Sequence, residues 1–578
     1  MSGCTGVPSS SPPEAVTAVG AQQPPPPAVS SPEAGAEPRT IVVDFLQNNA
    51  SFDAHHPAAR AFLTAEANNR WADTTVTIVD DQVVSNATAQ EHGVEQVVVT
   101  GDLIGSIDPN GIYTPKQTVG GGGTPTSVTY TLRQVKGQWR IDNVQPGGVG
   151  LLISYSQFTD YYTQRTLYFY DQDDAHLVPD PRFSSIADST DLASWLMTEL
   201  AQGARAELQP ATSTELPQQS DPRRVTVTPT SGVLKVEIPG SGSSQLSDAT
   251  KGRLAAQIAV TLSRALGGQD FTITDGGRPV EIPQVHNTVF SAASFLSLTS
   301  PVTVVPTLYY INTAGEVIDA STDEPIAGPL GVGAAYKLAS VGLATLSSTT
   351  TDRLLAAGTV GAPGAQTFYI GTTTDGLHQV AGISGALSRP AWVPYRDEVW
   401  IGAGTTLFRT ATSGAEAGVA LPVQISTGSD KVSLPIEALR FSPEGARVAL
   451  VLKSVDGDGQ IWIGSVVRTS ESVQINDLKQ ISPAGVSITD VAWTAPLKLF
   501  AVGRNLSGSA NVYELQSDGS LWTPKGIPNL PAQPDSITVS SGVPAAVSAA
   551  TSIWVQRAGT WGSPPAGTTH GTNPIYVE

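Results

Sequence analysis

The chain has 578 residues, with 56 glycines, 43 prolines and 14% charged residues, a balance that favours strands and turns over long surface helices. Its 51 acidic residues outnumber the 32 lysines and arginines, and the formal net charge of −19 argues against nucleic-acid binding, which needs positive charge against phosphates. The single cysteine excludes an internal disulfide and any multi-thiolate metal site, and no apolar run approaches the roughly 18–20 residues of a membrane-spanning helix.

That cysteine is Cys4, which directly follows Gly3. A bacterial lipoprotein signal ends in a small-residue tetrapeptide whose last member is a cysteine that becomes lipidated. The basic and apolar stretch expected before such a tetrapeptide is absent or truncated here, so either upstream residues are trimmed or the start codon is set too late. We predict that Cys4 is a lipidation site. The alternatives are a stray cysteine at a disordered terminus and a cytosolic chain.

The residues behind Cys4 have the composition of a tether. Residues 5–37 consist mainly of Pro, Ser, Ala, Gly and Glu, and include the run Pro24-Pro25-Pro26-Pro27. The segment has no apolar periodicity with which to bury a core, so we predict a disordered spacer over residues 1–37. As a coil it spans roughly 30–35 Å, and as polyproline about 100 Å.

Residues 38–155 show the pattern of an α+β domain. Apolar residues predict a short helix near 41–46 and a second helix from Pro57 to Trp71. Strands are predicted at 74–79, 94–107, 127–135 and 138–144, the last two joined by a turn at Lys136-Gly137. Helices followed by an antiparallel sheet resemble NTF2-like or cystatin-like domains.

A second α+β unit is predicted over residues 156–298. The predicted elements are a strand at 167–170, a turn at 171–175, a helix at 188–203, strands at 225–227 and 233–238, a helix from Ser247 to Gly267 and a hairpin over 271–282. The run from Leu167 through Val178 to Arg182, and the helix at 257–262 with the strand and Asp-Gly turn that follow it, resemble GerM-type sporulation and spore-germination domains.

Residues 299–578 contain short strands at regular distances. Similar segments open successive units at 340–344, 436–443, 488–493 and 537–539, and second strands follow at 447–452 and 497–502. Third strands are predicted at 398–402, 460–464 and 552–555. The period of about 45–50 residues is typical of propeller blades, which predicts five or six of them. A strand around Tyr309-Tyr310 is a guess for completing the last blade.

The order of these parts resembles the actinobacterial LpqB lipoprotein family over essentially the whole ordered chain. The resemblance implies a palmitate-bearing lipid anchor at the extracytoplasmic face of the cell membrane. It also implies an accessory role for the MtrA–MtrB two-component system, through contact with the sensor histidine kinase MtrB.

No catalytic constellation is recognisable. The sequence contains no G-x-S-x-G elbow, P-loop or H-E-x-x-H, and the Gly120–Gly123 run opens no helix. His55-His56 lacks a third metal ligand, and the segment 456–459 is a turn rather than a calcium loop. Acidic residues are numerous, so a glycosidase pair stays open. We expect no enzymatic activity, no metal and no cofactor.

Tryptophans are the remaining binding signal. Most of those in the propeller stand among Ile, Val or Ala, where blades need large apolar filling. Trp522 and Trp561 have more polar surroundings with Gly and Pro and are the weak candidates for exposed contacts. The alternative function is therefore cell-wall glycan binding, or less readily glycan hydrolysis, on a propeller face.

Overall fold

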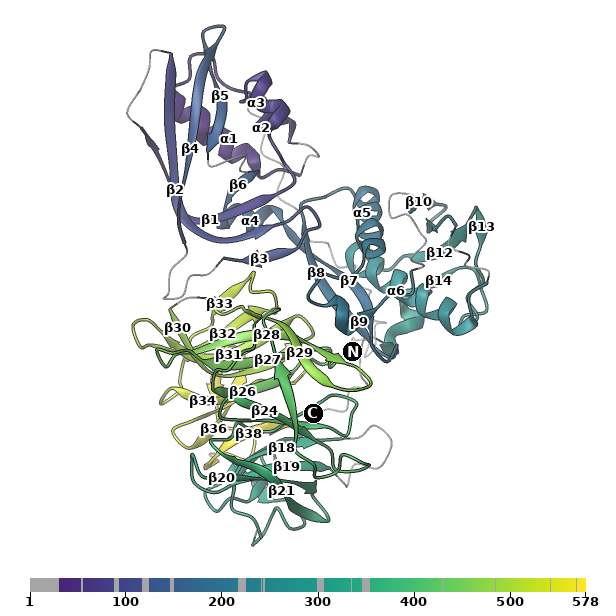
Figure 1. Ribbon diagram of the computed structural model, residues 1–578, viewed down its shortest axis with the longest axis vertical. Helices are drawn as coiled ribbons and strands as arrows, with labels where there is room; N and C mark the ends of the chain where they lie inside the picture. Colours follow the sequence, from purple (N-terminus) through teal and green to yellow (C-terminus); the bar gives the residue numbers. More distant parts are fainter. Residues whose placement is uncertain are drawn as a thin grey trace, which may run out of the picture.

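The computed structural model describes residues 31–52, 56–87, 93–116, 124–145, 150–216, 225–240, 242, 245–298, 306–333, 335–345, 354–428, 430–483, 485–540, 542–567 and 569–578. Cys4 and most of the predicted tether lie outside these ranges. Figure 1 shows an N-terminal domain at the top, a second α+β domain at its lower right, and a β-propeller beneath both. Among the helices within the described ranges, none is long and apolar enough to cross a membrane.

The N-terminal domain packs helices on a six-stranded sheet. The sheet has the order β5-β4-β2-β1-β6, with β3 paired to β2, and β1 and β6 run in parallel. Helix α1 begins at Pro38, where a missing N–H costs no hydrogen bond, and its buried face packs on the sheet. The elements are α1 Pro38–Asn49, α2 Pro57–Arg60, α3 Ala65–Arg70, β1 Val76–Asn86, β2 Val94–Ile107, β3 Tyr113–Pro115, β4 Thr124–Val135, β5 Gln138–Gln145 and β6 Leu151–Ser154.

The predicted helix from Pro57 to Trp71 is wrong as a single helix, because a turn at 61–62 ends α2 and Leu63 forms a β-bridge with Ile141 before α3 begins. The Ile141 N–H donates to the Phe62 carbonyl at 2.9 Å and the Thr64 N–H donates to the Ile141 carbonyl at 2.8 Å. The segment thus pairs with β5. Thr64 then caps α3, accepting a hydrogen bond from the Ala67 N–H.

The second domain is built around helix α6, whose residues 254–262 are buried. One sheet has the order β8-β7-β9 and another the order β10-β11-β12-β13, with β14 paired to β12. Strands β11 and β12 are parallel, with α6 crossing between them. The elements are α4 Tyr155–Tyr161, β7 Thr163–Asp171, β8 Leu177–Ser184, α5 Ser189–Gln202, η1 Gln209–Ala211, β9 Thr212–Ser213, β10 Thr226–Thr230, β11 Val233–Glu237, α6 Asp248–Leu266, β12 Asp270–Asp275, β13 Arg278–Pro279, β14 Phe290–Ser291 and η4 Ala292–Leu298.

Both predicted helices of this domain are confirmed, together with the residues that delimit them. Asp188 caps α5 by accepting hydrogen bonds from two backbone N–H groups, and Ser247 caps α6 by accepting one from the Thr250 N–H. Gly203 and Gly267 follow the two helices at φ values of 99° and 85°, a region that favours glycine.

The propeller consists, within the described ranges, of six four-stranded groups. Two of them share one eight-stranded sheet, so the predicted five or six blades become six. The strands are β15 Leu308–Asn312, β16 Val317–Asp319, β17 Glu324–Pro325, β18 Leu338–Ala344, β19 Leu355–Val360, β20 Gln366–Thr372, β21 Gly376–Gly385, β22 Ala391–Trp392, β23 Val399–Ala403, β24 Thr406–Thr410, β25 Leu421–Ile425, β26 Ile436–Phe441, β27 Arg447–Lys453, β28 Gly459–Arg468, β29 Val473–Gln480, β30 Val486–Ala495, β31 Lys498–Asn505, β32 Ala510–Gln516, β33 Trp522–Pro524, β34 Pro534–Thr538, β35 Ala546–Ala549, β36 Ser552–Arg557, β37 Thr560–Gly562 and β38 Gly571–Tyr576.

The ring is closed by strands from opposite ends of the propeller. Strand β15 carries Tyr309 and Tyr310 and pairs with β38, so the guess that this strand completes a blade is confirmed. One assignment was wrong: residues 398–402 belong to β23, the second strand of their blade. The short β22 precedes β23 and pairs with it, and a two-residue strand leaves little trace in a sequence pattern.

The third and fourth blades, counted from the one that β15 opens, are also joined at their outer edges. Their last strands, β25 and β29, pair in parallel through Gln424 with Gln474 and Ile425 with Ile475. This pairing merges the two blades into the eight-stranded sheet. The second domain contacts both of these blades, through Asp173 with Arg396 and through Glu207 with Lys479.

Candidate functional site

The structure places the two candidate tryptophans differently. Trp561 is 3% exposed and packs in a cluster with residues of the neighbouring blade, so it is no exposed contact. The central residue of β37 turns inward, although the surrounding Gly and Pro residues suggested a surface loop. Trp522 is half-buried, with its ring 5.0 Å from that of Tyr513. The Trp561 indole is therefore covered, whereas that of Trp522 stays partly exposed beside Tyr513.

The weaker motifs keep structural roles. His56 precedes α2 and is buried, with its Nδ1 3.8 Å from Asp73 Oδ2, while His55 and Gly120–Gly123 lie outside the described residues. Residues 456–459 form the turn between β27 and β28. The described ranges hold no group of three His, Cys, Asp or Glu side chains that could bind a metal ion.

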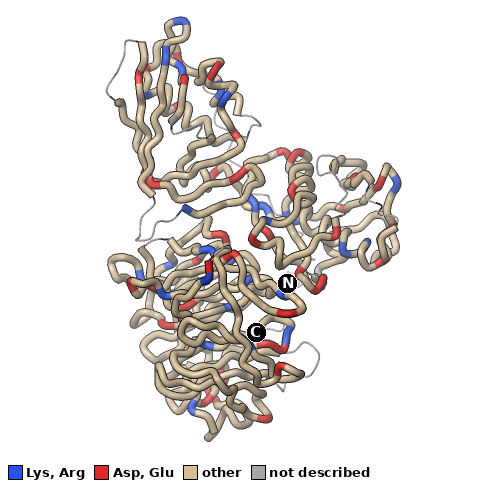
Figure 2. Tube along the Cα trace, in the orientation of Figure 1, with Lys and Arg blue, Asp and Glu red and all other residues tan. Residues whose placement is uncertain are grey.

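A turn of the second domain, residues 171–176, rests on loops of the propeller. Asp173 forms an ion pair with Arg396. Gln172 accepts a hydrogen bond from the backbone N–H of Arg468 at 2.8 Å and donates one to its carbonyl at 3.1 Å, as a neighbouring strand would. Figure 2 shows acidic and basic residues on both sides of this boundary. The contact is therefore polar and charge-matched.

A partly open cavity of about 200 Å³ lies at the same boundary. The ring of His176 stacks on that of Tyr395, with centroids 3.9 Å apart and an interplanar angle of 14°. His176 Nδ1 lies 3.0 Å from Asp171 Oδ2. Tyr395 has a φ of 64°, a conformation that costs a bulky residue roughly 1–3 kcal/mol, so the surrounding contacts must hold it there.

Arg447 links the second domain to two blades. Its guanidinium donates to Glu444 Oε1 at 2.6 and 3.0 Å, to the Pro179 carbonyl of the second domain at 3.1 Å, and to the Pro496 carbonyl at 2.9 Å. The guanidinium also lies 5.8 Å from the ring centroid of Trp493. A planar group with five donors suits such a junction.

Behind this junction, the second domain carries a buried charged cluster, which we call the Asp180 cluster and which consists of Asp180, Arg182, Glu199 and Arg205. Arg182 donates to Asp180 at 2.8 Å, and Arg205 does so at 2.7 Å through Nε. Burial raises the pKa of Asp180, but the guanidiniums of Arg205 and Arg182 outweigh it and leave the pKa below its usual value. Burial raises the pKa of Glu199 to about 7.

The raised pKa of Glu199 predicts a pH-dependent stability. Between its ordinary value of 4.5 and about 7, the folded chain holds this proton more tightly than the unfolded chain, so stability falls as pH rises through that interval. We expect Glu199→Gln to abolish this part of the fall and to raise the free energy of unfolding at pH 8 by about 1–3 kcal/mol. Urea unfolding at pH 5 and pH 8 measures both effects.

Glu66→Gln is the matched control, because the Glu66 side chain is 75% exposed and its charge is well solvated. Its pH profile should follow that of the unchanged protein. A Glu199→Gln profile with the original slope would contradict the assignment.

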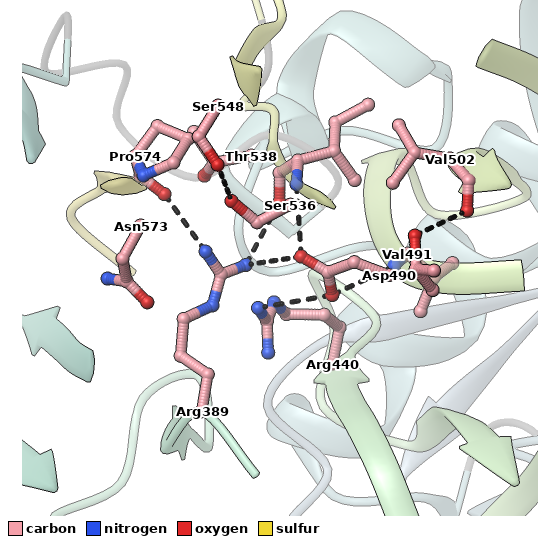
Figure 3. A network of polar contacts seen from close by, with 12 residues as sticks. Arg389, Arg440, Asp490, Val491, Val502, Ser536, Thr538, Ser548, Asn573 and Pro574 are labelled. Atoms are coloured by element: carbon pink, nitrogen blue, oxygen red, sulfur yellow. Dashed lines mark hydrogen bonds and ion pairs between the residues drawn. The ribbon is translucent and has the colours of Figure 1, made fainter. Parts of the chain in front are cut away.

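A second polar network lies at the inner strands of the propeller (Figure 3). Asp490 accepts hydrogen bonds from Arg389 at 3.2 Å, from the Ile537 N–H at 3.0 Å and from the Val491 N–H at 2.9 Å, and Arg440 lies 3.5 Å away. Arg389 also donates to the carbonyls of Ile537 and Pro574. The network ties the inner strands of several blades together.

These contacts bind and orient domains, and they bring together no nucleophile, base and orienting carboxylate within the described ranges. The sequence predicted residues 171–175 only as a turn, and the roles of Tyr395, Arg396 and Asp490 were missed. No local pattern marks these residues, because each contacts a partner at least 47 positions away.

Family models match the three parts in order. The description "Lipoprotein LpqB, N-terminal domain" matches residues 31–159, "Sporulation and spore germination" matches 166–281, and "Lipoprotein LpqB beta-propeller domain" matches 316–577.

Curated relatives named "Lipoprotein LpqB" are similar over most of the chain. The protein of Mycolicibacterium smegmatis is 28% identical over 82% of this chain and 78% of its own length. The protein of Thermobifida fusca is 24% identical over 90% of this chain and 88% of its own length. Among solved structures, TolB from Acinetobacter baumannii matches 49% of this chain and 70% of its own with a TM-score of 0.33 and 12% identity. The names of the two relatives describe lipoproteins and no enzyme.

Proposed function

We propose that the chain belongs to the LpqB family of lipoproteins and that it is a membrane-anchored, extracytoplasmic accessory protein without catalytic activity. Cys4 carries the lipid, including palmitate. The second domain and the propeller bind the extracytoplasmic part of the sensor kinase MtrB and thereby modulate the MtrA–MtrB system. The observation that carries the proposal is the order of the three matched domains behind a cysteine and a proline-rich tether.

Anchoring gives a weak interface a physical advantage. Two partners held at one membrane meet at a high effective concentration, and avidity can exceed the intrinsic affinity by about 10²–10⁴. The contacts of Asp173 and Arg447 between the second domain and the propeller support a composite surface that is presented as a unit.

The proposal predicts that the anchor strengthens binding to the kinase at a membrane. The lipidated chain and its Cys4→Ser variant are each added to proteoliposomes that hold full-length MtrB, and bound protein is measured by flotation. We expect Cys4→Ser to lower the apparent affinity by about 10²-fold or more. Both forms should bind the soluble kinase ectodomain equally, because the anchor contributes nothing there.

Purified peptidoglycan serves as the second arm of the same experiment. Binding to peptidoglycan without binding to MtrB would overturn the kinase proposal and favour the glycan-binding alternative. Equal flotation of the lipidated chain and Cys4→Ser would overturn the role of the anchor.

A further inference from the structure

The cavity between the turn at 171–176 and the propeller loops has a lining rich in carboxylates. Asp171, Asp173 and Glu444 line it, against the guanidiniums of Arg396 and Arg468. Arg468 is already paired with Glu398, which accepts hydrogen bonds from it at 2.8 and 3.0 Å and is not part of the lining. Glu444 is likewise paired with Arg447, which also lies outside the lining, and the lining itself holds three carboxylates against two guanidiniums.

Glu444 is the most deeply buried of these three carboxylates. Its side chain is 4% exposed, and Arg447 donates to Oε1 alone. The other oxygen, Oε2, is buried and has no hydrogen-bond partner in the part of the chain that the structure describes. A buried carboxylate oxygen without a donor is costly, so this atom favours a ligand that brings one.

Aromatic and apolar groups complete the lining. Tyr395 and His176 form a stacked pair at the cavity, and aromatic rings next to carboxylates favour cations. Burial, together with the nearby charges of Glu444 and Asp171, raises the pKa of Tyr395, which agrees with a negative potential at this place. The apolar wall consists of Ala211, Val393, Pro394, Ala446 and Val466.

We propose that this cavity binds a primary ammonium group at the end of a short alkyl chain, as in a lysine side chain. The volume of about 200 Å³ corresponds to about six or seven water volumes, which suits a chain of about five carbons and one nitrogen. The ammonium group donates to Glu444, and the methylenes lie along the apolar wall. Because the walls come from two domains, the ligand stabilises the docked arrangement.

The full chain is titrated with n-pentylamine and, separately, with its uncharged analogue 1-pentanol. Binding of each ligand is measured by saturation-transfer NMR. We expect binding of the amine and at least tenfold weaker binding of the alcohol. Glu444→Gln keeps an acceptor for Arg447 and should weaken amine binding by about 10- to 100-fold, the value of a hydrogen bond between charged groups. Tyr395→Ala is the second variant and should also weaken it, through loss of the ring.

Asp456→Asn is the matched control, since it removes one exposed negative charge on the turn between β27 and β28. It should leave amine binding unchanged. Nα-acetyl-lysine methylamide, compared with the free amine, distinguishes a peptide side chain from a small amine as the source of the group. Equal binding of pentylamine and pentanol, or equal effects of Glu444→Gln and Asp456→Asn, would overturn the proposal without bearing on the contact with the kinase.

Discussion

Replacing Asp490 with alanine should lower the free energy of unfolding of the propeller by about 3–5 kcal/mol, the usual effect of removing one partner from a buried ion pair. The side chains of Asp490, Arg389 and Arg440 are 7%, 11% and 8% exposed. Without the carboxylate, both guanidiniums stay buried and lose their hydrogen-bonded counter-ion, and Arg440 keeps only the weaker influence of Glu578, whose pKa burial raises to about 7. The Ile537 N–H also loses its acceptor at the inner strand of the next blade. Guanidinium chloride unfolding followed by tryptophan fluorescence measures the loss.

Two controls separate charge from packing. Asp490→Asn keeps the shape and an acceptor oxygen but loses the charge, so we expect an intermediate loss of stability. Asp456→Ala removes an exposed carboxylate and should change the free energy of unfolding by less than about 0.5 kcal/mol. A loss of this small size for Asp490→Ala would mean that the network does not hold the ring.

Replacing Asp180 with alanine should destabilise the second domain by a similar amount, about 3–5 kcal/mol. Asp180 is fully buried, and it accepts hydrogen bonds from Arg182, from Arg205 Nε and from the Arg205 N–H. Arg182 is itself only 2% exposed, so it cannot regain solvation when the carboxylate is removed. Thermal unfolding with hydrogen-exchange mass spectrometry locates the loss in β7, β8 and α5.

The effect should reach the domain boundary. The neighbouring Pro179 carbonyl accepts from Arg447, and Glu207, close to Arg205 in the chain, pairs with Lys479 of the propeller. We therefore expect faster proteolysis between the domains of Asp180→Ala than of Asp270→Ala, which removes an exposed carboxylate on β12. Equal proteolysis and equal stability of the two variants would contradict the role of the Asp180 cluster.

The Asp180 cluster also predicts how stability changes at low pH. The pKa of Asp180 is lower in the folded chain than in the unfolded chain. The carboxylate therefore contributes its full stabilisation above the pKa of the unfolded chain, and this contribution is lost as the pH falls through the pKa of the folded chain. The raised pKa of Glu199 acts in the opposite direction at higher pH. Burial raises the pKa of both carboxyl groups, but the guanidiniums of Arg205 and Arg182 outweigh burial at Asp180, whereas Arg182 offsets it only in part at Glu199.

The sequence pattern predicted strands, turns and helices correctly where their contacts are local. The bounds of β2 were predicted as they are found. The hairpin of β4 and β5 was predicted from alternation and from the turn at Lys136-Gly137, two residues that both have positive φ. The two helices of the second domain follow from their caps and apolar faces. The division between α2 and α3 was missed, because it depends on Ile141, which lies far along the chain.

Surface and interior were harder to assign than strands. Trp561 stands among Gly, Pro and polar residues, yet the neighbouring blade covers it. An outermost strand faces water at its edge while its faces pack on adjacent blades. Local composition describes the neighbours in sequence, whereas exposure depends on the blade alongside.

The sequence by itself determined the order of two α+β domains and a propeller, because composition, strand period and helix caps are local properties. It also pointed to the LpqB family and to Cys4 as the predicted anchor. Only the tertiary structure decided which strands close the ring, which loops receive the second domain and which charges meet at Asp490. The pairs β15 with β38, Asp173 with Arg396, and Arg389 with Asp490 join residues about a hundred or more positions apart. Such contacts arise when the chain packs, and no repeat or motif along the sequence encodes them.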